Sequence, residues 1–79
     1  MPGPEVAALG EPARLAGFAL TGVTVHAAET DDEVRAAWSA IVAGGTDRIG
    51  AVVLTARAAA ALGAARSAPG SPLTAVMPA

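Results

Sequence analysis

The residues of this chain that could take part in chemistry gather after two predicted strands. Gly10 and Glu11 follow a short apolar run, and Thr55 and Arg57 follow a longer one. If both runs are parallel strands of one sheet, these residues face each other outside its carboxyl ends, where open α/β sheets bind ligands. A phosphate cradle there needs Gly-x-Gly-x-x-Gly or a Walker lysine, and the sequence contains neither. We therefore interpret Gly10-Glu11 as an ordinary strand-to-helix turn.

Two further polar groups have a simpler explanation than catalysis or metal binding. His26 is the only histidine, and no Ser or Cys nucleophile pairs with it in a local motif, so we interpret it as a polar surface residue of an edge strand. Thr30 and Glu33 have the spacing of a capping box, and the two aspartates between them suit the positive end of a helix. The acidic run Asp31-Asp32-Glu33 therefore predicts a helix start in preference to a metal site.

Charge and composition make several classes of protein unfavourable. The chain has 79 residues, a net charge of −2, no cysteine and no lysine. Its basic residues are scattered singly, whereas nucleic-acid binding favours clustered ones. They are Arg14, Arg35, Arg48, Arg57 and Arg66. No apolar run approaches the roughly 18 residues of a membrane span, and Met1 is followed by Pro-Gly-Pro without the pattern of a secretory signal. We expect a soluble intracellular protein without a cofactor.

The central element is the apolar run Ile49–Thr55, which predicts a strand covered on both faces. Three other strands and three helices are predicted around it. The strands are Val6–Leu9, Val23–Ala27 and Leu73–Met77, and the helices run from Glu11 or Pro12 to Leu20, from Thr30 to Val42 and from Ala56 to about Arg66. Their alternation with strands predicts a parallel sheet with helical crossovers.

The polarity of the strands predicts their order. The first and third strands are apolar throughout and belong inside the sheet, whereas the second and fourth alternate and belong at its edges. With right-handed crossovers the order is 2-1-3-4. The predicted fold class is α/β, a Rossmann-like or flavodoxin-like four-stranded parallel sheet with helices on both faces. Residues 1–79 form one domain, with a loose Pro/Gly leader at residues 1–4.

Two helices show an apolar face. Leu15, Phe18 and Ala19 share one side of the first helix. The clearest amphipathic helix is the second, whose apolar residues recur at positions i, i+3, i+4, i+7 and i+8. These residues are Val34, Ala37, Trp38, Ile41 and Val42. We expect both faces to pack against the sheet.

Four segments in this order resemble the F subunit of the V/A-type (archaeal and vacuolar) ATPase or ATP synthase. That family has a strand, Gly-Asp and a helix with Gly-Phe-x-Leu-Ala-Gly, similar here to Gly10-Glu11 and to residues 17–22, Gly-Phe-Ala-Leu-Thr-Gly. An acidic amphipathic helix corresponds to residues 30–42. The family's Asp-Ile-Gly-Ile-Ile-Leu-Ile strand is similar to residues 47–55 of this chain, which contain one inserted residue. The family's last strand, which is bounded by prolines, is similar to residues 72–78.

The resemblance implies a parallel four-stranded sheet and a non-catalytic rotor component of the central stalk. Such a protein binds the long coiled coil of the D subunit, called the stalk coiled coil below, and couples or regulates rotation. It is cytoplasmic and peripheral to the membrane. Candidate partner contacts are Glu11, Arg14, Arg48 and Arg57, although Arg48 and Arg57 are also typical of surface salt bridges.

The chain departs from the family at two places, and other functions stay open. Residues 11–14, Glu-Pro-Ala-Arg, replace a more acidic turn that contains threonine, and we expect the family's C-terminal helix to be missing because only Ala79 follows Pro78. One alternative is a domain that senses a small ligand or phosphate in the crevice between Gly10-Glu11 and Arg57. A weaker one is a receiver-like or anti-sigma-antagonist-like domain, although receivers need a lysine and clustered acids.

Overall fold

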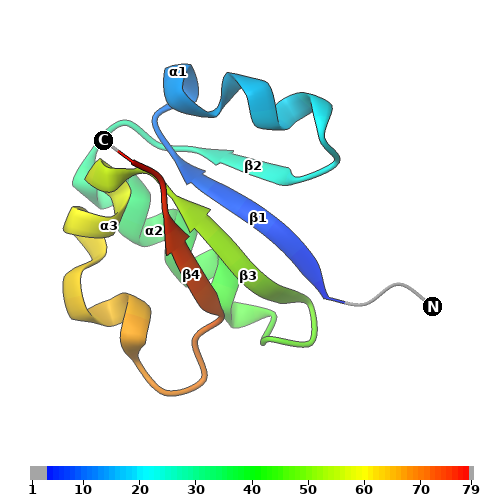
Figure 1. Cartoon of the computed structure of the whole chain (residues 1–79). Coiled ribbons are helices and arrows are strands. Elements are labelled where there is room, and N and C mark those ends of the chain that lie inside the picture. The colour runs from blue at the N-terminus through cyan, green and yellow to red at the C-terminus, as the bar shows by residue number, and fades with distance from the viewer. Residues whose placement is uncertain (1–3, 79) are drawn as a thin grey trace.

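The computed structural model describes residues 4–78, which form a parallel sheet with helices on both sides (Figure 1). The predicted leader lies largely outside these residues. The strands are β1 (Glu5–Gly10), β2 (Thr24–Ala27), β3 (Ile49–Leu54) and β4 (Leu73–Val76). The helices are α1 (Pro12–Leu15), α2 (Asp31–Ala43) and α3 (Ala56–Leu62), and the 3-10 helices are η1 (Ala16–Leu20) and η2 (Gly63–Ser67).

The sheet has the order and direction that the strand polarity predicts. All three pairings are parallel and the order is β2-β1-β3-β4, so the α/β fold with the 2-1-3-4 sheet is confirmed. The pairing of β1 with β3 is irregular at its start. Glu5 pairs with Ile49 and Val6 pairs with Ala51, so Gly50 has no partner in β1. The winding direction reverses between β1 and β3, which places Gly10 and Leu54 at neighbouring strand ends.

The main core lies between the sheet and the pair α2 and α3. Alternate residues of β1 and β3 point to this side and meet the predicted stripe of α2, where Val34, Trp38 and Ile41 are buried. From α3 come the small residues Ala58 and Ala59 together with Leu62. Because alanine side chains are short, helices lined with them can lie close to the sheet. The predicted inner face of α2 is confirmed.

Two predicted helices are shorter than the sequence suggests. The first is α-helical only over Pro12–Leu15 and continues as the 3-10 turns of η1, and the third changes to η2 at Gly63. Gly63 adopts φ +54, a left-handed conformation that an α-helix cannot contain and that glycine tolerates. Gly17 lies in η1 and weakens helical continuity there. The predicted single helices to Leu20 and Arg66 are therefore wrong in their second halves.

The opposite side of the sheet is thinly covered. Apart from Pro72, the described buried apolar residues outside the main core cluster are Ala8 and Leu15. Leu15 belongs to α1, which contacts β1 and β2, so this half of the face is covered. Phe18 is half-buried, and the side chain of Ala19 lies outside what the structure describes.

The central strand β3 is not covered on both faces, contrary to the expectation from its apolar sequence. Val52 and Leu54 are buried toward α2 and α3, whereas Ala51 and Val53 on the other face are only half-buried. The crossover helices explain the difference. In Figure 1, α1 and η1 lie beside β1 and β2, and nothing in residues 4–78 lies over β3 and β4 on that side.

Candidate functional site

The carboxyl ends of β1 and β3 are joined by a direct bond between Thr55 and Glu11. The Thr55 hydroxyl donates to Oε1 of Glu11 and accepts the backbone N–H of Ala58 at 3.2 Å, which caps α3. Thr55 is 1% exposed, and among the residues that the structure describes it is the one polar residue that is buried. Its own N–H donates to the Leu9 carbonyl at 3.2 Å. The switch point of the sheet is thus bridged by side chains of this chain.

Gly10 allows this bond to form. A Cβ on Gly10 would meet the side chain of Thr55, with the two Cβ atoms 2.8 Å apart. The residue also has φ +156, a conformation rare for other residues. Its carbonyl accepts the N–H of Ala28 at 2.9 Å. Gly10 therefore lies at a strand-to-helix turn, as the sequence predicts, and its lack of a Cβ lets Thr55 pack closely against it.

Glu11 is held in its ionised form by its neighbours. The hydrogen bond from Thr55 lowers the pKa of Glu11 below its ordinary value of 4.5. Partial burial opposes this effect, and the charges of Arg57 and Arg14 lower the pKa by smaller amounts. Arg14 also donates to the Pro78 carbonyl at 3.2 Å, which connects α1 to the end of β4. The carboxyl edge thus brings together three of the four candidate contact residues.

Arg48 lies away from these three residues. It precedes β3, so it is at the amino end of the sheet, where its carbonyl accepts the N–H of Glu5 at 2.8 Å. Its side chain is exposed and passes close to Gly44 at the end of α2. Arg57 is also exposed, at the start of α3. A single partner surface at the carboxyl edge can include Glu11, Arg14 and Arg57 but not Arg48.

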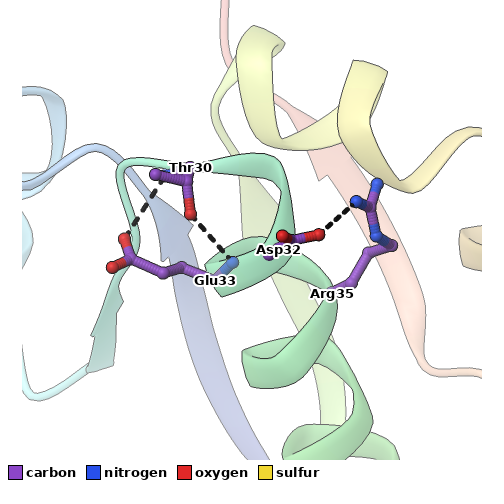
Figure 2. A network of polar contacts seen from close by, with 4 residues as sticks. All are labelled: Thr30, Asp32, Glu33 and Arg35. Carbon is purple, nitrogen blue, oxygen red and sulfur yellow. Dashed lines mark hydrogen bonds and ion pairs between the residues drawn. The ribbon is translucent and has the colours of Figure 1, made fainter.

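The acidic run at the start of α2 acts as the predicted capping box (Figure 2). The N–H of Glu33 donates to the Thr30 hydroxyl at 3.1 Å, and Oε1 of Glu33 accepts the N–H of Thr30 at 3.3 Å. Asp32 pairs with Arg35 at 2.6 Å on an exposed face. Within residues 4–78 no group of three His, Cys, Asp or Glu side chains is placed to hold a metal.

His26 occupies the edge strand β2, opposite Leu9 of β1. It is half-buried, and its Nε2 is buried without a hydrogen-bond partner among the described residues. A lone imidazole on a strand gives no catalytic arrangement by itself. His26 lies on the predicted edge strand, but its buried Nε2 differs from the surface position that the sequence predicts.

An apolar surface on β1, β3 and β4 is the feature that sequence reasoning missed. We call it the apolar strip, and it consists of Val6, Ala51, Val53, Leu73 and Ala75. Register places Val6 beside Ala51, Ala51 beside Leu73, and Val53 beside Ala75, all on the side of the sheet away from α2 and α3. Leu73 is 79% exposed and Val6 is 42% exposed. The predicted strand order could have revealed this surface. Three right-handed crossovers in the order 2-1-3-4 place two helices on one face of the sheet and one on the other, so the second face is covered only in part.

Comparison of the chain with protein-family models and with curated proteins finds no match. Over the described residues, none of the helices has both the length and the apolar character needed to cross a membrane.

Proposed function

We propose that this protein is a non-catalytic component of a complex that works by binding another protein, and that the apolar strip is its binding surface. The observation that carries the proposal is the exposure of Leu73 and Val6 on a parallel sheet. Parallel sheets are normally covered on both faces, so an apolar sheet face that the described chain leaves open is a candidate for covering by another protein.

For the specific partner we propose the stalk coiled coil of a V/A-type rotary ATPase or ATP synthase. The support is the resemblance of four segments to the F subunit of that family, in the same order, together with a sheet of the architecture that this resemblance implies. In this role the protein is a rotor component of the central stalk, in the cytoplasm and peripheral to the membrane. It transmits or regulates rotation without hydrolysing ATP.

Binding of a small ligand or phosphate in the switch-point crevice is less well supported. Thr55 and Glu11 already bond to each other there, and the Glu11 carboxylate is held ionised. A negative charge at this position opposes an anionic ligand. We therefore prefer the protein-binding function.

The direct test is binding of the purified chain to the stalk coiled coil encoded by the same genome, measured by isothermal titration calorimetry. We expect a 1:1 complex. The variant Leu73→Glu should weaken it at least tenfold, because a carboxylate enters the apolar contact. Ala60→Glu adds the same charge on the exposed side of α3 and serves as the matched control. Absence of binding by the unmodified chain would refute the proposed partner.

A further inference from the structure

We infer that the occupant of the apolar strip is one amphipathic α-helix of a partner protein, with a carboxylate at the end that lies beside Arg14. This inference rests on the protein-binding part of the proposed function, but not on the identity of the partner. It follows from the width of the strip, from the helices beside it and from the charge at one end.

The strip has the dimensions of a short helix. Neighbouring strands are about 4.8 Å apart, so the three strands β1, β3 and β4 span about 10 Å, close to the diameter of a helix. The four residues of β4 extend about 13 Å, the length of about nine helical residues. The residues facing the occupant include Ala51 and Ala75, whose short side chains let a helix backbone come close. A helix with apolar residues at i, i+3, i+4 and i+7 fits this strip.

A second copy of the chain fits it less well. A stable dimer buries about 800 Å² on each copy, so it would extend well beyond a strip of this size onto the neighbouring strands. There α1 and η1 lie on the same side of the sheet over β1 and β2. Two sheets pack about 10 Å apart, so these helices would obstruct the stacking of two copies face to face. A single helix avoids the obstruction because it lies beside α1.

Charge indicates the chemistry at one end of the helix. Arg14 bonds to the Pro78 carbonyl, which places its guanidinium at the carboxyl end of β4 and therefore at one end of the strip. Arg14 forms no ion pair within residues 4–78, although its charge acts on the Glu11 carboxylate, and the strip itself contains no charged residue. A carboxylate on the docked helix would complement this charge. If that end is the helix N-terminus, the helix dipole favours the same acidic residue.

The inference is tested by attaching a helix to the full chain. A flexible Gly/Ser linker after Ala79 is followed by a 14-residue helix with Leu at i, i+3, i+4, i+7 and i+11 and Glu in its first turn. The carbonyl of Pro78, one residue before the end of the chain, accepts from Arg14, so this attachment suits a helix whose first turn lies at that end of the strip. The tether converts binding into an intramolecular event of roughly millimolar effective concentration. The matched control has the same linker and the same helix composition, with the residues shuffled so that the apolar period is lost.

We expect the amphipathic fusion to unfold about 4–8 °C above the shuffled fusion. Amide resonances of Val53 and Ala75 should shift, while those of the α2 and α3 core should not. Leu73→Glu should abolish the difference between the fusions, and Arg14→Gln should reduce it. Because Leu73 is exposed, its replacement should leave the fold intact.

Equal unfolding temperatures of the two fusions would overturn the inference, as would shifts confined to the α2 and α3 side. Sedimentation equilibrium showing a dimer that Leu73→Glu dissociates would assign the strip to a second copy instead. If the fusions behave alike while the chain still binds the stalk coiled coil in a way that Leu73→Glu weakens, the inference fails and the proposed function stands. If the amphipathic fusion is stabilised and the stalk coiled coil does not bind, the proposed partner fails and the inference stands.

Discussion

Gly10→Ala tests whether the close contact between β1 and Thr55 holds the switch point together. The added Cβ would lie 2.8 Å from the Cβ of Thr55, and Thr55 cannot withdraw easily because it is 1% exposed and bonded to Glu11 and Ala58. Overpacking costs about 1–3 kcal/mol, and the φ of +156 at Gly10 adds strain for alanine, so we expect a loss of about 2–4 kcal/mol. The free energy of unfolding of a chain of 79 residues is about 4–12 kcal/mol, so this loss is a large part of the total stability.

The assay is urea unfolding followed by the fluorescence of Trp38, the only tryptophan, which is buried in the main core. Gly17→Ala is the control, because a Cβ there has no neighbour within 4 Å. It should leave stability unchanged or raise it by up to about 1 kcal/mol. Thr55→Ala removes Cγ2 and Oγ1, two of the three Thr55 atoms that the added Cβ would meet. The double variant with Gly10→Ala should therefore lose less free energy of unfolding than the sum of the two single losses. A Gly10→Ala midpoint equal to that of the unmodified chain would refute the reasoning.

The capping box of α2 predicts that Thr30→Ala lowers the free energy of unfolding by about 1 kcal/mol in the same urea assay; no change would mean that the cap contributes nothing. The pKa of Glu11 is lower in the folded chain than its ordinary value of 4.5, so its contribution to stability is present above that pH and is lost as the pH falls through the folded pKa. The urea midpoint of Glu11→Gln should therefore lie below that of the unmodified chain at pH 7, and the difference should shrink as the pH falls below 4.5; a constant difference would contradict this. His26→Phe removes a buried unpartnered nitrogen and should raise the free energy of unfolding by about 1 kcal/mol, whereas a loss would show that the imidazole makes a favourable contact.

The order of the strands could be predicted from the sequence because it depends on local patterns. The apolar run from Ile49 and the alternating run from Val23 determine which strands lie inside and which lie at an edge. The start of α2 was predictable for the same reason, since Thr30 and Glu33 satisfy each other within four residues. Such local signals are independent of what packs against them.

The candidate site was predicted only in outline. The meeting of Gly10-Glu11 with Thr55 follows from the strand order, but the bond that Thr55 donates to Glu11 depends on side-chain positions that no sequence pattern specifies. Coverage of the second face was predicted wrongly, because an apolar sequence shows that a strand can be buried and not that a helix is present to bury it. Val53 is apolar and central, yet only half-buried.

The most direct test of the proposed binding surface is the affinity of the stalk coiled coil for the unmodified chain and for Leu73→Glu, with the unfolding midpoint measured on the same samples. We predict equal unfolding midpoints, because Leu73 is 79% exposed, and an affinity at least tenfold lower for Leu73→Glu. Full affinity in this variant would contradict the assignment of the apolar strip as the working surface of the protein.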